Sequence, residues 1–146
     1  MSTEQNRHLV RQVIEEIWNG GDLDLADRVF APGYVNHGGL IPDLVRGPEA
    51  IKISVVLYRT AFPRFRVTVI DLLTQGQTVA LRWAAHRTPP YAGVQGGPDR
   101  GPDTLRGMTF GRVVEGQIIE SWTCWEPGGA EELVIVQDIR AWARSG

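Results

Sequence analysis

The spacing of apolar residues changes once along the chain, and this change constrains the fold more than any other feature. Up to residue 62, apolar side chains recur every three to four positions, as they do on one face of an α-helix. From residue 65 to residue 125 they largely alternate with polar ones, as in half-buried β-strands. Helices followed by strands predict an α+β fold, and 146 residues suit a single domain over 1–146.

Three helices are expected in the first part of the chain. The first carries a capping-box pattern at its start and ends at Gly20-Gly21. The second runs from about Leu23 to Phe30. The third begins at Gly47-Pro48, because proline is favoured in the first helical turn, and Pro63 ends it. A further helix is expected near the C-terminus, from Ala130 to Trp142.

The expected strands form an antiparallel meander. Gln75-Gly76 and Glu115-Gly116 supply tight turns, and the Gly- and Pro-rich residues 89–103 predict a long loop. The strands are expected at 65–73, 78–88, 104–114 and 117–125. Helices that cover one face of such a curved, mostly antiparallel sheet leave a cone-shaped hollow, whose floor is the inward face of the sheet.

Charge and cysteine content exclude several classes of protein. The formal net charge is −2 and the 15 Lys and Arg are scattered, which argues against nucleic-acid binding. Cys124 is the only cysteine, so no internal disulfide can form and a reducing compartment fits. No apolar run reaches the ~20 residues of a membrane span, and the N-terminus carries no secretory pattern. We expect a soluble, cytoplasmic protein that binds neither nucleic acid nor a membrane.

Motifs for metals, nucleotides and nucleophilic catalysis are missing. There is no G-x-G-x-x-G, no Walker A, no H-E-x-x-H and no G-x-S-x-G. His8, His37 and His86 are far apart in the sequence, so no metal site is expected. We expect no cofactor, and an enzyme of this kind would depend on side-chain acids and bases around an apolar pocket.

The last strand, GQIIESWTCWE from 116 to 126, holds several candidates. Alternation places Ile118, Glu120, Trp122, Cys124 and Glu126 on one side, and Ile119, Ser121, Thr123 and Trp125 on the other. Both sides carry a tryptophan, so either could line a cavity while the other packs or meets a second subunit. Glu126 is a candidate base if it is desolvated, or else an ordinary solvated strand end. Cys124 is interpreted as a small core residue and not as a nucleophile.

Two further segments carry polar groups suited to catalysis. The segment YVNH, from Tyr34 to His37, fits a pocket wall, or else a structured turn in which Asn36 bonds its own backbone. His86 lies on the second strand and is of a residue type that titrates near working pH, although a lone strand histidine is more often structural. The catalytic candidates are therefore Asn36, His37, His86 and Glu126.

Aromatic and methionine side chains concentrate on the expected sheet. They predict an apolar cavity of at least ~300 Å³, the lower limit of ordinary ligand pockets. The expected lining is Tyr34, Trp83, Met108, Phe110, Trp122 and Trp125. The strands are apolar on both sides and helices can cover only one, so we expect the outer face to join two copies in a homodimer.

Four stretches together resemble the SnoaL-like polyketide cyclase family, within the nuclear-transport-factor-2-like fold. They are WNGGDLDLADRVFAPGYVNH (18–37), RGPEAIK (46–52), AFPRFRVTVIDLLTQGQTVALRW (61–83) and GRVVEGQIIESW (111–122). The resemblance implies a cone-shaped α+β barrel with an apolar cavity, usually oligomeric, which binds aromatic polyketide intermediates without a metal or flavin.

The resemblance also implies an acid/base set, most of which this chain lacks. In the cyclases an Asp on the last strand is the acid and base, helped by an Asn, a His and a Gln. Asn36 matches the Asn, but Gly107 and Thr109 stand where the Gln and His fall. Thr123 stands near the place of the Asp and is a substrate-binding candidate. These departures argue against aldol ring closure, which needs a donor for the developing alkoxide, more than against oxygenation.

Three functions are compatible with these residues. The first is a cofactor-free hydroxylase of an aromatic, anthracycline-type polyketide, in which a general base forms a carbanion or enolate that meets molecular oxygen. The second is a SnoaL-type cyclase with Glu126 in place of the aspartate. The third is a non-catalytic ligand-binding protein. Aromatic and titratable residues that converge on the expected pocket favour the enzymes, and the need for a reductase partner stays open.

Overall fold

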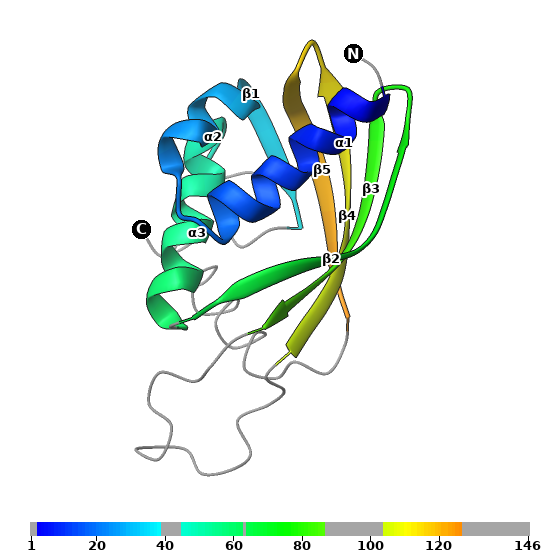
Figure 1. Ribbon diagram of the computed structural model, residues 1–146. Helices are drawn as coiled ribbons and strands as arrows, with labels where there is room; N and C mark the ends of the chain where they lie inside the picture. The colour runs from blue at the N-terminus through cyan, green and yellow to red at the C-terminus, as the bar shows by residue number, and fades with distance from the viewer. Residues whose placement is uncertain (1–2, 39–44, 63, 87–103, 127–146) are drawn as a thin grey trace, which may run out of the picture.

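Three helical segments pack on one face of a curved five-stranded sheet in the computed structural model (Figure 1). The structure describes residues 3–38, 45–62, 64–86 and 104–126. The strand order is β1-β5-β4-β3-β2, so β1 and β2 are the two edges of the open sheet that the described residues form. The expected α+β class is confirmed, whereas the expected loop at 89–103 and helix at 130–142 lie outside the described residues.

The helical segments bury the apolar stripes that the sequence shows. α1 (Thr3–Gln12) continues into a π-helical segment, η1 (Val13–Trp18), and five apolar side chains of the two are buried: Leu9, Val10, Val13, Ile14 and Ile17. α2 (Leu23–Val29) starts at Asp22, whose carboxylate accepts a hydrogen bond from the backbone N–H of Leu25 at 3.1 Å. α3 (Pro48–Ala61) begins after Gly47, whose φ of 79° favours glycine.

The first strand, β1 (Phe30–His37), differs from expectation. α2 ends at Val29, and the segment expected as a turn or pocket wall is a strand that pairs in parallel with the last strand of the sheet. The sequence did not predict this strand, because it contains Pro32 and Gly33 and both residue types are uncommon inside strands. The pairing is irregular there, with a register shift between Phe30 and Val35.

The expected antiparallel meander is confirmed. It consists of β2 (Arg66–Gln75), β3 (Thr78–His86), β4 (Thr104–Val114) and β5 (Gln117–Trp125). Glu115 and Gly116 join β4 to β5 with φ of 49° and 79°, as a two-residue type I′ turn requires.

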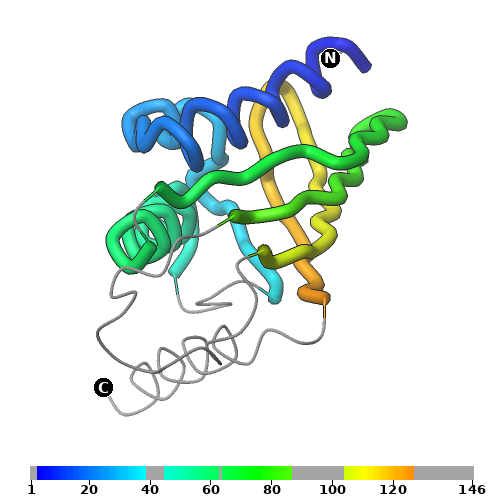
Figure 2. Tube along the Cα trace, turned by 60° about the horizontal axis from the view of Figure 1, so that its bottom comes forward, coloured from blue at the N-terminus to red at the C-terminus, as the bar shows by residue number. Residues whose placement is uncertain are grey.

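A bulge in β5 changes the simple alternation expected for this strand. Arg112 pairs with Glu120 while Val113 pairs with Ile118, so Ile119 is the extra residue. Ile118 therefore lines the concave face together with Ser121, and not the face of Glu120. Viewed from below, the sheet curls under the helices (Figure 2). The buried apolar side chains of the two layers form one core.

Candidate functional site

A cavity of about 150 Å³ lies between the helices and the concave face of the sheet. Its walls are mostly aliphatic and aromatic, with Trp18 and Tyr58 from the helices and Trp83 and Trp125 from the strands. The volume is smaller than the ~300 Å³ expected, so that prediction of size is wrong. Two indole rings occupy much of the floor: Trp83 and Trp125 meet edge to face, with ring centroids 5.3 Å apart.

Five of the predicted site residues line this cavity. They are Tyr34, Asn36, Trp83, Thr123 and Trp125. The residues of β5 that face inward are therefore Ile118 before the bulge and Ser121, Thr123 and Trp125 after it, which settles the side that the sequence left open.

Three predicted lining residues lie elsewhere. Met108, Phe110 and Trp122 are 48%, 47% and 39% exposed on the outer face, which we define as the convex side of β3, β4 and β5 away from the helices. The prediction that they line the cavity is wrong, because Phe110 and Trp122 are cross-strand partners on the side opposite Thr109 and Thr123. Cys124 is exposed on this outer face as the partner of Met108, which corrects its interpretation as a core residue.

The predicted titratable candidates do not line the cavity either. The ring of His37 stacks on Trp122 on the outer face, and its Nε2 lies 2.8 Å from Oε2 of Glu120. His86 is exposed at the end of β3, where its ring nitrogens contact the hydroxyls of Thr104 and Thr68 at 3.2 and 3.4 Å. Glu126 is an exposed strand end whose backbone N–H bonds the carbonyl of Arg106.

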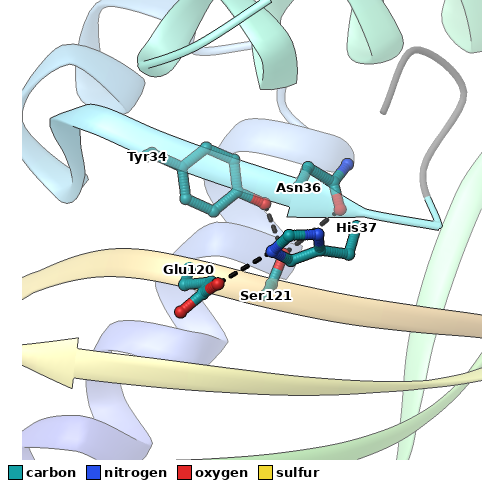
Figure 3. A network of polar contacts seen from close by, with 5 residues as sticks. All are labelled: Tyr34, Asn36, His37, Glu120 and Ser121. Atoms are coloured by element: carbon teal, nitrogen blue, oxygen red, sulfur yellow. Dashed lines mark hydrogen bonds and ion pairs between the residues drawn. The ribbon is translucent and has the colours of Figure 1, made fainter. Parts of the chain in front are cut away.

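A hydrogen-bonded chain of three side chains joins β1 to β5 at one side of the cavity (Figure 3). The hydroxyl of Ser121 donates to Oδ1 of Asn36 at 3.2 Å. That hydroxyl has one proton, so the phenol of Tyr34 is the donor in its 2.5 Å contact with Oγ of Ser121. Nδ2 of Asn36 forms no hydrogen bond with any described residue. It therefore keeps two N–H donors available beside the cavity.

The environment of Tyr34 keeps it a donor. The side chain is 1% exposed, and burial raises the pKa of its phenol, against a smaller lowering by the hydrogen bond to Ser121. The phenol therefore stays protonated at neutral pH and does not act as a base. Its role in the chain of donors is to hold Ser121 and, through it, Asn36.

A second polar group lies on the floor of the cavity. Nε1–H of Trp83 donates to Oγ1 of Thr109 at 3.0 Å, and Oγ1 of Thr109 lies 3.0 Å from Oγ1 of Thr123. The two hydroxyls carry two protons, and the hydrogen bond between them uses only one. Whichever threonine donates, one hydroxyl proton of the pair remains for a bound ligand.

Sequence reasoning missed Ser121 and did not assign a role to Thr109. Strand alternation could have identified both residues, since Ser121, for example, shares a side with Thr123 and Trp125. The missing signal was which side faces inward. That is set by the helices, which cover the concave face, and by pairing with the irregular strand β1.

The described residues of the site can stabilise an anionic oxygen through neutral donors. Among the described residues, no Asp, Glu, His, Lys, Arg or Cys lines the cavity. Within the same residues, no three His, Cys, Asp or Glu side chains come together as a metal site would require. No described helix is long and apolar enough to cross a membrane.

Fold and site together define a class of protein: an open α+β cone with an apolar cavity over its concave sheet and neutral hydrogen-bond donors on the cavity wall. The chain belongs to the SnoaL-like polyketide cyclase family, whose model matches residues 8–131. A search of curated proteins finds no significant match.

Solved structures share the fold. A proposed polyketide cyclase from Bacillus cereus is 18% identical, with a TM-score of 0.70 over 95% of this chain and 85% of the other. IdmH from Streptomyces antibioticus, also a proposed polyketide cyclase, is 24% identical, with a TM-score of 0.69 over 90% and 97%. AclR from Streptomyces galilaeus, a proposed hydroxylase, is 22% identical, with a TM-score of 0.69 over 94% and 98%. These neighbours support the nuclear-transport-factor-2-like fold. The family supports an enzyme.

Proposed function

We propose that the protein is a cofactor-free hydroxylase of an aromatic, anthracycline-type polyketide intermediate. One observation carries the proposal: the cavity wall offers neutral donors from Asn36 and from the Thr109–Thr123 pair, and no described carboxylate or imidazole. Such a wall favours an enolate or phenolate oxygen. Its described residues include no carboxylate or imidazole that could act as both base and acid in an aldol closure.

The size of the cavity limits how the substrate sits. A volume of about 150 Å³ does not enclose a fused multi-ring molecule. We place one aromatic edge of the substrate in the cavity against Trp83 and Trp125, with its anionic oxygen at Nδ2 of Asn36. The rest of the molecule extends toward solvent.

The anion forms because the substrate itself is acidic. A phenol or a carbon acid between two carbonyls loses its proton readily, and donors at the oxygen lower the pKa of that group further. His37, His86 and Glu126 were candidates for the base, but none of them lines the cavity. In this mechanism the proton leaves to water at the open side of the cavity, and the protein contributes position and charge stabilisation.

The oxygen chemistry balances as follows. The carbanion form of the substrate gives two electrons to molecular oxygen and, with one proton, forms a carbon hydroperoxide. Cleavage of its O–O bond to an alcohol and water takes two further electrons and two protons. An external reductant, such as a reductase partner, supplies these electrons.

The proposal includes a homodimer joined through the outer face. Met108, Phe110 and Trp122 are exposed there side by side, because Phe110 pairs with Trp122 and with Ala80 of β3. Contiguous exposed apolar side chains of this kind are typical of interaction surfaces.

The direct test is incubation of the intact protein with a panel of anthraquinone intermediates, with and without a reductant, under ¹⁸O₂. A product that gains one ¹⁸O atom supports the hydroxylase. An isomer of unchanged mass, or loss of water, would identify a cyclase instead. Saturable ligand binding without any product across the panel would mean that the protein is a non-catalytic binding protein. The observation that favours this alternative is that no charged group is found in the described lining.

A further inference from the structure

A second hollow, of about 330 Å³, has the opposite character to the cavity. It is lined by Asn19, Arg59, Arg64, Phe65 and Arg66. Phe65 is the residue that the hollow and the cavity share. The cavity lining described above carries no charge, whereas three of the five residues here are arginines.

The path of the chain brings the three arginines together. Arg59 lies in the last turn of α3, and β2 begins at Arg66. Between them the backbone N–H of Phe65 bonds the carbonyl of Phe62 at 3.1 Å, and Arg64 adopts a φ of 65°. A left-handed arginine is an unfavourable backbone state that the surrounding structure must enforce. The turn thereby places Arg64 beside the same hollow as its two neighbours.

Hydrogen bonds hold one wall of the hollow in place. Nη1 of Arg59 donates to the carbonyls of Trp18 and Asn19 at 3.1 and 2.6 Å, at the end of the first helical segment. The side-chain amide of Asn19 bonds the backbone of Val67 twice, at 2.8 and 2.7 Å. Arg59 is therefore anchored through Nη1, and its other N–H groups bond no described residue. Asn19 is a support and not a ligand.

The positive charges of the hollow have no counter-charge among the described residues. Neither Arg64 nor Arg66 forms a hydrogen bond or ion pair with a described side chain, and no carboxylate lines the hollow. Three like charges around one space repel one another and raise the local concentration of anions. Guanidinium groups also present paired N–H donors that match the oxygens of phosphate.

We propose that Arg59, Arg64 and Arg66 form a binding site for a doubly charged oxyanion of the phosphate monoester class. Three cations favour a dianion over a monoanion, and the fork of each guanidinium favours phosphate over a spherical ion such as chloride. The site is separate from the chemistry proposed for the cavity, so neither depends on the other. A free phosphate ion and a phosphate carried on a larger metabolite share this chemistry.

The test uses the intact protein and NMR signals of the arginine Nε–H groups at constant ionic strength. We expect inorganic phosphate to shift the signals of Arg59, Arg64 and Arg66 saturably, and dimethyl phosphate, a monoanion, to bind at least tenfold more weakly. Equal binding of methyl phosphate, a dianion, would assign the site to phosphate monoesters in general. Binding of inorganic phosphate alone would assign it to the free ion.

Matched variants separate a built site from general charge. Arg64→Gln and Arg66→Gln, both at exposed positions, should each weaken phosphate binding at least tenfold. Arg112→Gln removes the same charge from the outer face and should leave binding unchanged. Arg66→Lys keeps the charge but loses the paired N–H donors of the guanidinium. Its affinity for phosphate should lie between that of wild type and that of Arg66→Gln. Shifts that stay linear in phosphate, or an equal loss in Arg112→Gln, would overturn the proposal.

Discussion

The two faces of the sheet are built from the same strands and have opposite chemistry. On the concave face, Ser121 and Thr123 are bonded to other polar side chains beside two tryptophans, and no described charge lines the cavity. The outer face carries charged side chains instead: Nη2 of Arg82 lies 2.6 Å from Oδ2 of Asp71, and Nε2 of His37 lies within hydrogen-bond distance, 2.8 Å, of Oε2 of Glu120. The side chains of Arg82 and Asp71 are each more than half exposed, so water stabilises their charges, whereas burial under the helices would penalise them.

This difference explains why titratable residues are poor guides to this site. A histidine or glutamate in a strand has an even chance of either face by position alone. Here His37 and His86 fall on the outer side together with Arg82 and Arg106. The polar groups of the described residues that line the cavity are neutral, and those of Ser121, Thr109 and Thr123 each bond another side chain.

The largest effect is expected at Asn36 on the concave face. Asn36→Ala removes the amide donors beside the cavity and should lower kcat/KM on the order of 10²-fold. Asn36→Asp should be at least as damaging, because its negative charge would repel a developing oxyanion. Gln117→Ala is the control, since it removes an amide that bonds the backbone of Arg28 outside the cavity. Steady-state turnover of whichever substrate passes the mass assay is the measurement, and near wild-type values for both Asn36 variants would contradict the site.

Gly107 gives the next largest effect, on stability. It lies between Trp83 and Trp125 as their cross-strand partner, and a Cβ there would be 2.4 Å from Cζ2 of Trp83 and 2.9 Å from the carbonyl oxygen of Cys124. Gly107→Ala should therefore lower the free energy of unfolding by about 1–3 kcal/mol. Gly33→Ala, where a Cβ would meet nothing within 4 Å, is the matched control in urea unfolding. Equal stability of the two variants would show that Trp83 can move aside.

Gly107 also shows which parts of the site the sequence could reveal. The resemblance placed Gly107, Thr109 and Thr123 where the cyclases carry their Gln, His and Asp. All three lie on the concave face, so the positions were predictable. The groups that fill the space of the missing Gln, His and Asp side chains were not predictable. The ring that covers Gly107, for example, belongs to Trp83 on another strand.

The fold was more predictable than the site for a similar reason. Helix stripes and strand alternation are local, and they placed α1, α3 and the four strands of the meander. β1 was missed because its pairing with β5 is non-local and its Pro32 and Gly33 resemble a turn. The inward side of β5 depended on that pairing and on the bulge at Ile119, and neither has a local signature.

Alkaline pH should lower the free energy of unfolding because the Tyr34 phenol is buried. Burial raises the pKa of the Tyr34 phenol in the folded protein, while the unfolded phenol has an ordinary pKa near 10. Unfolding is therefore favoured by ionisation of the released phenol. The stability tied to Tyr34 is complete below about pH 10 and falls above it, by up to about 1.4 kcal/mol per pH unit. Urea unfolding from pH 9 to 11 should show wild type losing stability faster than Tyr34→Phe, and parallel curves would contradict this.

On the outer face, a change of charge should alter assembly and not the cavity. Phe110→Lys or Trp122→Lys would each place one charge per copy within the proposed dimer surface, where burial would penalise it. We expect each to weaken dimerisation at least tenfold, an effect of about 1.4 kcal/mol, as measured by sedimentation at several concentrations. Val56→Lys, at an exposed position on α3, is the control. A wild-type protein that is monomeric at micromolar concentration would remove the dimer from the proposal.

The smallest effects are expected for the titratable residues at exposed strand ends. The ring of His86 bonds two threonine hydroxyls, and the carboxylate of Glu126 lies 4.0 Å from Nη1 of Arg106 with both side chains more than half exposed. Exposed contacts of this kind contribute little, typically below ~1 kcal/mol. His86→Gln and Glu126→Gln should therefore keep kcat/KM within about twofold of wild type, with an unchanged pH profile. A large loss in either variant, with its fold intact by circular dichroism, would mean that a charged group on the outer side does reach the substrate. The concave face would then not be the only face that acts on the substrate. A mechanism in which a protein side chain is the general base would replace the one in which the substrate loses its proton to water.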